Sequence, residues 1–224
     1  MSEAPVKGRR YNSDRRQQQA GRTRLQILEC ARELFIDHGY GVTTIADIAA
    51  AATVSVETVY SAFGSKACVL QRVWDITIGG DDQQVLFHER PEIQALMAEP
   101  DLARRLSMWA VVFTRTARRM TPFIRAVQGA AATEPAAAAL LTEMGRQRLA
   151  GMTVMARSAA ATGQLAVTEH ECRDLMWAMT DGALWHRLVV ERGWSDKKFA
   201  QWLGSLWTAM LVRPEGAKTP HPGP

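Results

Sequence analysis

The segment between Thr43 and Lys66 is rich in side chains that can bind phosphate oxygens and the edges of nucleic-acid bases. Hydroxyl groups stand at Thr44, Ser55 and Tyr60, and Lys66 adds an ammonium group; all of these are common phosphate ligands. Lys66 also begins a further helical pattern, where free backbone N–H groups favour an anion. The chemistry that these residues predict is the binding of a polyanion.

Three consecutive residues of the same segment suit the distinction of one base pair from another. Val56 can pack on a thymine methyl group, and Glu57 can accept a hydrogen bond from a cytosine amino group. The Thr58 hydroxyl can bond to a base edge or to a phosphate, whereas the Glu57 carboxylate repels a misplaced phosphate. This pattern predicts that a helix reads DNA sequence in the major groove.

Two short helical patterns hold these side chains. The first covers Ile45–Ala52 with Thr44 as its N-cap, and the second covers Val56–Phe63 with Ser55 as its N-cap. Because isolated helices of two turns are marginal in water, we expect the first helix to brace the second. The residues expected to pack them together are Ile45, Ile48, Ala49, Val54, Val59 and Phe63. This is helix-turn-helix geometry, in which the second helix enters the major groove.

The excess of basic residues lies at the N-terminus. Residues 1–24 contain seven basic and two acidic residues, a net charge of +5, whereas the whole chain carries +4. Basic residues that neutralise phosphates release condensed counterions, so this segment suits DNA. A solubilising tail is the alternative interpretation. We expect residues 1–21 to form a basic, flexible arm.

The chain resembles the TetR (tetracycline-repressor) family of transcriptional regulators over about 45 residues. The matching residues are Ala31, Leu34–Phe35, Gly39–Tyr40, Thr43–Thr44–Ile45, Asp47–Ile48–Ala49, Val54–Ser55, Thr58–Val59–Tyr60, Phe63, Ser65–Lys66 and Leu70. The sequence departs from the family at Thr53, a position at which family members often have Gly. A threonine there indicates a turn that tolerates a β-carbon. It also departs at Glu57, where Gly or another small residue is frequent, so the operator of a relative does not transfer.

The resemblance implies that the arm from Arg9 to Arg24 lies along the DNA backbone or in the minor groove. The full set of residues expected to contact DNA is Arg22, Arg24, Thr44, Ala46, Ser55, Val56, Glu57, Thr58, Tyr60 and Lys66.

The remaining sequence also has helical periodicity, which predicts an all-α protein without a sheet. Helices are expected at residues 22–38, from 66 onward, at 92–98, 101–119, 122–132, 135–162, 168–192 and 195–212, with breaks at Pro122, Pro135, Gly163 and Gly193. We therefore expect a three-helix DNA-binding domain at residues 22–66 and a helical ligand-binding and dimerisation domain at 67–212. A disordered tail is expected at 213–224, where Pro and Gly are frequent.

Methionine and aromatic residues are frequent in the long helices of the second domain. Thioethers and indoles line adaptable apolar cavities well, and the family resemblance implies a pocket for a small effector. The residues expected to line it are Trp109, Phe113, Met152, Met155, Met176 and Trp177. An ordinary hydrophobic core is the alternative interpretation of the same residues.

The last two predicted helices are too apolar for a lone surface hairpin, and the resemblance pairs them with those of a second subunit in a four-helix interface. The segment Glu191–Leu203 resembles the family's joint between them. The interface is expected to contain Leu175, Met179, Leu184, Leu188, Trp202, Leu206 and Met210, with Phe199 and Trp207 beside them. A two-fold dimer would hold its reading helices roughly 34–36 Å apart, which predicts a near-palindromic operator.

Other classes of protein find little support in the sequence. No apolar run is long enough for a membrane span and the N-terminus lacks an apolar signal core, so we expect a cytoplasmic protein. No phosphate-binding loop, nucleophile elbow or clustered metal ligand set is present, and we expect no enzyme activity, cofactor or metal. Two alternatives to a ligand-responsive repressor stay open: a regulator of this fold without small-molecule control, and an all-α enzyme or carrier.

Overall fold

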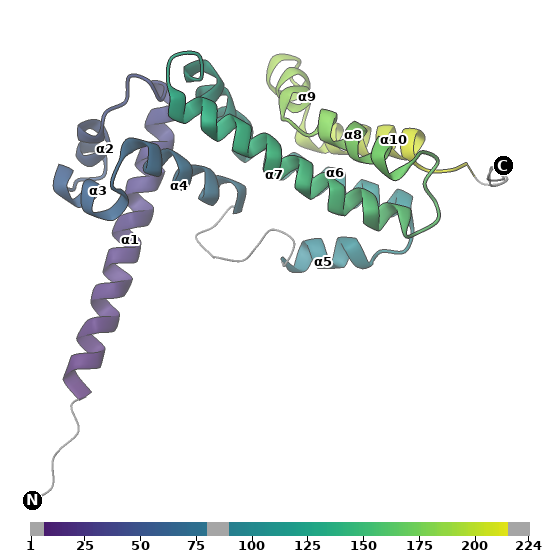
Figure 1. Cartoon of the computed structure of the whole chain (residues 1–224). Coiled ribbons are helices and arrows are strands. Elements are labelled where there is room, and N and C mark those ends of the chain that lie inside the picture. Colours follow the sequence, from purple (N-terminus) through teal and green to yellow (C-terminus); the bar gives the residue numbers. More distant parts are fainter. Residues whose placement is uncertain (1–6, 80–89, 215–224) are drawn as a thin grey trace, which may run out of the picture. The chain divides into compact units, whose positions relative to one another are not determined.

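The computed structural model describes the backbone of residues 7–79 and 90–214 and the side chains of residues 18–78 and 90–214. This part of the chain is helical, apart from its connecting segments and one isolated bridge between Leu165 and Val212, and the predicted all-α class is confirmed (Figure 1). No helix in the described ranges is both long and apolar enough to cross a membrane. The chain forms two compact units, which divide at residues 77, 124 and 140.

The first unit extends to Thr77 and also includes Arg125–Leu140. It contains α1 (Lys7–Asp37), α2 (Ile45–Ala51), α3 (Val56–Phe63), α4 (Lys66–Gly79), the end of α6 and the start of α7 (Figure 1). Side chains that are fully buried in it include Ile27, Ala31, Phe35, Ile48, Val59, Val69 and Val73. These residues recur at helical spacing on one face of each helix, so packing rather than intrinsic propensity stabilises the two short helices.

The first helix begins at Lys7 rather than near residue 22. Of the expected flexible arm, residues 7–21 therefore continue α1, and residues 1–6 lie outside the described residues. The segment contains no internal proline and is rich in Arg and Gln, which are good helix formers. A nucleated helix extends through such residues at little cost, because each added residue closes one hydrogen bond.

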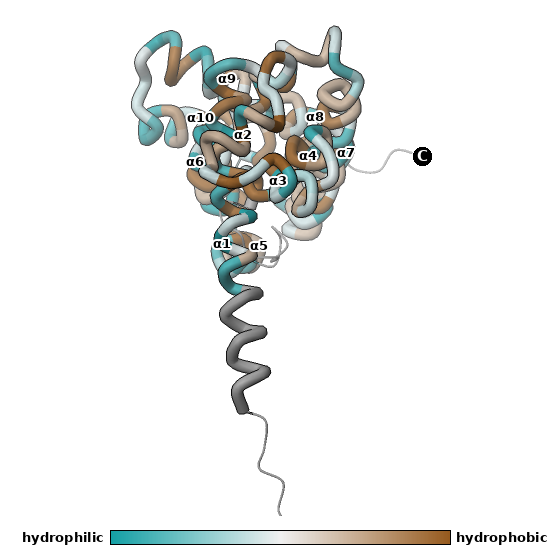
Figure 2. Tube along the Cα trace, turned by 90° about the vertical axis from the view of Figure 1, so that its left-hand side faces the viewer, coloured by the Kyte–Doolittle hydropathy of each residue, from teal (hydrophilic) through white to brown (hydrophobic). Residues whose placement is uncertain are grey.

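The second unit contains α5 (Pro91–Ala98), most of α6 (Leu102–Ala130) and α7 (Pro135–Ala160), and the C-terminal helices α8 (Glu169–Met179), α9 (Ala183–Trp185), η2 (His186–Glu191) and α10 (Asp196–Leu211). Its core includes Phe199, Leu203, Trp207 and Leu211, which are fully buried on one face of α10. Hydrophobic and hydrophilic residues both occur along these helices in Figure 2, as amphipathic packing requires.

The predicted break at Pro122 is wrong, because α6 continues through this residue. Proline removes one backbone hydrogen bond and disfavours the helix interior. Met120, Phe123 and Ile124 are buried around it, however, so the helix packs into the core on both sides of the proline. Burial of this apolar face outweighs the local preference.

The predicted single helix over residues 168–192 is also wrong. It is interrupted after α8, and Gly182 has a φ of +89°, which favours glycine. A β-carbon at Gly182 would lie 2.4 Å from the Thr121 hydroxyl oxygen, so α6 approaches the backbone closely here. The chain then continues as α9 and as η2, a π-helix. No strong sequence signal marks this break, since a single glycine is tolerated in many helices.

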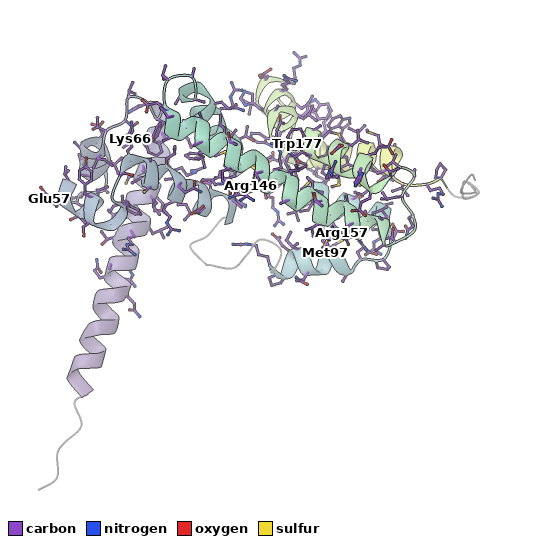
Figure 3. All side chains as sticks on the ribbon, in the orientation of Figure 1. Glu57, Lys66, Met97, Arg146, Arg157 and Trp177 are labelled. Carbon is purple, nitrogen blue, oxygen red and sulfur yellow. The ribbon has the colours of Figure 1, made fainter. Side chains whose placement is uncertain are left out.

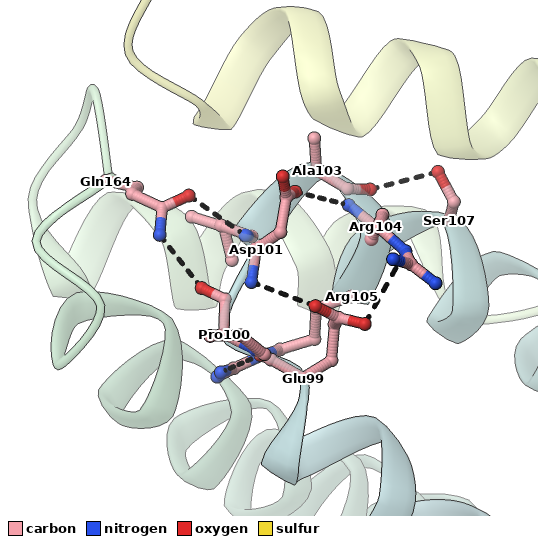
Figure 4. Close-up of polar contacts among 9 residues, drawn as sticks. Glu99, Pro100, Asp101, Ala103, Arg104, Arg105, Ser107 and Gln164 are labelled. Atoms are coloured by element: carbon pink, nitrogen blue, oxygen red, sulfur yellow. Dashed lines mark hydrogen bonds and ion pairs between the residues drawn. The ribbon is translucent and has the colours of Figure 1, made fainter.

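A buried arginine ties α5 to α6 and α7. Arg105 is 6% exposed, and its guanidinium donates to the Glu99 carbonyl and, at 3.1 and 2.8 Å, to the carbonyl and hydroxyl of Ser158. The neighbouring Gln164 amide accepts from the Leu102 N–H at 3.0 Å and donates to the Pro100 carbonyl at 2.9 Å (Figure 4). These bonds satisfy backbone groups that the turn between α5 and α6 would otherwise leave unpaired.

Candidate nucleic-acid interface

The short helix α3 presents one polar face and buries the other. Val59 is fully buried, whereas the Tyr60 side chain is 51% exposed and Glu57 and Ser61 are exposed. Figure 3 shows Glu57 on the outer side of α3. The observed bounds of α3 are those that the sequence predicts. Among the predicted base-reading residues, Val56 and Thr58 are half-buried beside Glu57.

Local hydrogen bonds fix the start of α2. The Thr44 hydroxyl accepts from the Asp47 N–H at 3.1 Å and donates to the Asp47 carboxylate at 2.7 Å, and that carboxylate accepts from the Thr44 N–H at 2.8 Å. This is a reciprocal capping box. The same bonds, that from the Thr44 side chain first, lower the pKa of Asp47. The sequence predicted the Thr44 cap, and the structure adds Asp47 as its reciprocal partner.

Ser55 fixes the start of α3 in a similar way. Its hydroxyl oxygen accepts from the Thr58 N–H at 3.2 Å and lies 3.1 Å from the Thr58 hydroxyl. Glu57 stands in the same first turn, where hydrogen bonds from its own backbone N–H and from Ser55 lower its pKa. The Glu57 carboxylate is therefore charged at neutral pH and acts purely as an acceptor.

The turn between α2 and α3 differs from the expected one. Thr53 has a φ of +55°, the left-handed region, and it is the only residue other than glycine with positive φ in the described ranges. A β-branched residue is strained in this conformation. Glycine adopts this conformation without strain, which is a physical reason for the Gly that is frequent in the family at this position. The turn therefore accommodates the β-carbon of Thr53 only with strain.

A groove runs between α1 and α3. Its lining residues are Gln19, Ala20, Thr23, Arg24 and Ile27 from α1 and Glu57, Thr58, Ser61 and Ala62 from α3. The groove joins Arg24, one of the predicted phosphate-binding residues, to the predicted base-reading face. Gln19, Thr23 and Ser61 were not among the predicted DNA-contacting residues. The packing of α1 beside α3 brings them there, and no local motif marks them.

The remaining predicted DNA-contacting residues lie at several places in the first unit. Arg22 is exposed on α1 and Ala46 is exposed at the start of α2. Lys66 begins α4, and its ammonium donates to the Tyr40 carbonyl at 2.9 Å and to the Gly41 carbonyl at 3.4 Å. Figure 3 shows Lys66 at the start of α4. These positions are compatible with DNA contacts, which stay predictions.

The predicted pocket residues are separated into two groups. Those buried in the second unit are Trp109, Phe113, Met152, Met155 and Met176. Trp177 is instead 37% exposed, and the Arg148 guanidinium lies 4.8 Å from the centre of its ring. Trp177 occurs at the end of α8, one position from the buried Met176, so it points to a different side of the helix and is unlike the other five.

All of the predicted interface residues of α8, α9, η2 and α10 are half-buried, namely Leu175, Met179, Leu184, Leu188, Trp202, Leu206 and Met210. Phe199 and Trp207, which were expected beside them, are fully buried within their own unit. That expectation is wrong, because these two residues occupy the inner face of α10. The interface prediction itself stays open.

The N-terminal sequence matches the family model of bacterial regulatory proteins of the tetR family over residues 27–73. The matched range runs from the second half of α1 through α2 and α3 into α4. No curated protein sequence is similar enough to this chain to be matched with it.

Solved structures of transcriptional regulators share the fold. A putative transcriptional regulator from Saccharomonospora viridis in complex with choline is 20% identical; the match covers 87% of this chain and 100% of that chain, with a TM-score of 0.64. NalD, the secondary repressor of the MexAB-OprM multidrug efflux pump in Pseudomonas aeruginosa, is 20% identical, with coverages of 86% and 98% and a TM-score of 0.62. SmeT in complex with triclosan is 21% identical, with coverages of 90% and 99% and a TM-score of 0.61.

Proposed function

We propose that this chain, whose residues 27–73 match the family model of bacterial regulatory proteins of the tetR family, is a sequence-specific DNA-binding transcriptional regulator. In this proposal it acts as a homodimeric repressor that a small, largely apolar ligand releases from its operator. The observation that carries the DNA-binding role is the exposed polar face of α3, on a helix that Val59 and the Ser55 cap hold in place.

The residues of this face and of the neighbouring α1 and α2 have distinct parts in the proposal. Glu57 accepts from a cytosine amino group, because a carboxylate is the complement of that donor in the major groove. Tyr60 donates its hydroxyl to a phosphate, and Arg22 and Arg24 neutralise phosphates from α1. Thr44 and Ser55 contribute mainly as helix caps, since their oxygens already serve backbone N–H groups.

Selection from random duplex DNA tests the proposal. The purified protein should enrich a near-palindromic sequence, and its affinity for that sequence should fall steeply as the salt concentration rises. Glu57→Ala should change the preferred base at one position of each half-site, whereas Arg24→Met should weaken binding to all sequences. A protein that enriches no sequence over random duplex is not a sequence-specific regulator.

The half-buried apolar residues of the C-terminal helices support the homodimer. Apolar side chains that stay partly exposed on neighbouring helices suit an interaction site, and two-fold dimers are the commonest assemblies of soluble proteins. Light scattering should give twice the chain mass, and Leu206→Asp should give a folded monomer with weaker operator binding. A wild-type monomer at micromolar concentration would contradict this part of the proposal.

The effector proposal rests on the chemistry of the second unit. The buried methionine and aromatic side chains listed above can repack around an apolar molecule, and two structures of the same fold were solved with choline and with triclosan. A screen of small apolar compounds should find some that release the selected operator. If none releases it, the protein is a regulator without small-molecule control.

A further inference from the structure

We propose that Arg148 and Trp177 bind the carboxylate of an organic acid with an apolar body, and that this acid is the effector. The inference rests on the proposed function and deepens it, because it names the chemical class of the ligand. The central guanidinium carbon of Arg148 lies 4.8 Å from the centre of the Trp177 ring. This cation–π contact joins α7 to the end of α8 within the second unit, where Figure 3 labels Trp177.

Arg148 differs from the other two arginines of α7 in its partners. The Arg146 guanidinium donates to both carboxylate oxygens of Glu143, at 2.8 and 2.6 Å. Arg157 lies 3.9 Å from the carboxylate of Glu169. Arg148 forms no ion pair with any residue in the described ranges, and its Nε–H is buried without an acceptor there. A buried donor without an acceptor costs free energy, and a bidentate carboxylate can satisfy Nε and a terminal nitrogen of the guanidinium together.

Burial makes the Arg148 guanidinium a poorly solvated cation. Loss of water around the group lowers its pKa, and the negative charge of Asp181 has the smaller, opposite effect. The Asp181 carboxylate accepts from the Ala183 N–H at 2.8 Å, at the start of α9. An arginine stays protonated in proteins, so Arg148 keeps its full charge. A charge that is withdrawn from water attracts an opposite charge more strongly than an exposed one does.

The side chains next to this cation are apolar. Met144 precedes Arg148 by four residues and Met152 follows it by four, so the three share one face of α7, and both methionines are buried. Met176, next to Trp177 in α8, is also buried. Thioethers repack readily around irregular apolar shapes. This surrounding suits an anionic group that is attached to an apolar body.

Trp177 lies away from the predicted dimer interface. Leu175 and Met179, which are expected in that interface, stand two positions before and two positions after it in α8. At 3.6 residues per turn, residues two positions apart lie on nearly opposite sides of a helix. The Trp177 side chain is 37% exposed. A ligand can therefore contact this side of α8 without displacing a second subunit.

The experiment measures the binding of organic acids to the full chain by calorimetry. The probes are phenylacetate, 4-phenylbutyrate and octanoate, each compared with its primary amide, which has the same shape without the charge. Arg148→Met removes the guanidinium, and Arg148→Lys keeps a charge without the planar fork. Arg146→Met is the matched control, because it removes a positive charge two positions away on α7. Circular dichroism establishes that each variant is folded at the assay temperature.

At least one acid should bind the wild-type protein about tenfold or more tightly than its amide does, the effect of one charge-assisted hydrogen bond. Arg148→Met should reduce the affinity for the acid to that for the amide and leave the affinity for the amide unchanged. Arg148→Lys should recover only part of the loss, because an ammonium group cannot bind two oxygens side by side. The acid should also change the tryptophan fluorescence, and Trp177→Phe should remove most of that change.

Four results would overturn the inference. No acid binds more tightly than its amide, or Arg146→Met weakens the acid as much as Arg148→Met does, which indicates a general effect of surface charge. The fluorescence change persists in Trp177→Phe, which places the acid elsewhere. Arg148→Met lowers the unfolding temperature and leaves the affinity for every acid unchanged, which assigns Arg148 a structural role only.

Release of DNA tests the effector role separately from the site. The acid that binds through Arg148 should release the selected operator from the wild-type protein at concentrations that leave Arg148→Met bound to it. An acid that binds through Arg148 without releasing the operator refutes the effector role and supports the site. If the wild-type protein enriches no duplex, the proposed function fails, whereas calorimetry still decides whether Arg148 and Trp177 bind a carboxylate.

Discussion

Thr53→Gly should stabilise the first unit. Thr53 is exposed and has a φ of +55°, where the β-carbon crowds the backbone at a cost of about 1–2 kcal/mol. Glycine removes this strain and keeps the backbone hydrogen bond from the residue 53 N–H to the Ala50 carbonyl, which is 3.1 Å long. Glycine also gives the unfolded chain more freedom, which takes back about 0.4–1 kcal/mol. The expected net gain in the free energy of unfolding is about 0.5–1 kcal/mol.

The assay is urea unfolding at one fixed protein concentration, because the proposed dimer would make stability depend on concentration. Thr133→Gly is the matched control: Thr133 is also exposed in the first unit, and its φ is not positive. The control should lower the midpoint of unfolding, since it adds freedom to the unfolded chain without relieving strain. If Thr53→Gly lowers the midpoint as much as the control does, the left-handed turn does not strain Thr53 and the reasoning is refuted.

Three other variants test the contacts that shape the two units. The pKa of Asp47 is lowered in the folded chain, so its capping contribution to stability is present above the pKa of the unfolded carboxyl group. This contribution is lost as the pH falls through the pKa of the folded state. Asp47→Asn should therefore flatten the acid side of a plot of unfolding free energy against pH. Arg105→Met should lower the free energy of unfolding by about 2–4 kcal/mol, measured by urea denaturation, because it leaves buried carbonyl oxygens unpaired. Gly182→Ala should lower the unfolding temperature, because residue 182 has a positive φ and the added β-carbon clashes with Thr121. The free energy of unfolding should fall by about 2 kcal/mol or more. Thr121→Ala in the same chain should recover part of this loss.

The helix-turn-helix could be predicted well because its signals are local. The bounds of α3 and the caps at Thr44 and Ser55 follow from residues within one turn of each other. Helix caps, turn residues and apolar spacing act over four or five residues, so they are visible in the sequence itself. α10 begins with the same kind of local cap, because the Ser195 hydroxyl accepts from the Lys198 N–H, although the prediction from the sequence did not include it.

The errors arose where distant packing overrides a local preference. Pro122 was expected to end a helix, but the buried residues around it keep α6 continuous. Gly182 was expected to lie inside a helix, but it has a positive φ and lies against Thr121 of α6, so the helix is interrupted there. Neither outcome can be predicted from sequence spacing, because both depend on which segment packs on which.

The sequence by itself predicted the all-α class, the resemblance to the TetR family and the polar side chains on and next to α3. Only the tertiary structure decided which of those polar groups are already engaged. Lys66 is a typical phosphate ligand in the sequence, yet its ammonium lies 2.9 Å from a carbonyl oxygen of a residue far back in the chain, Tyr40. The physical reason is that a side chain's chemistry is fixed by its type, whereas its partners are fixed by the segments that packing brings within hydrogen-bonding distance.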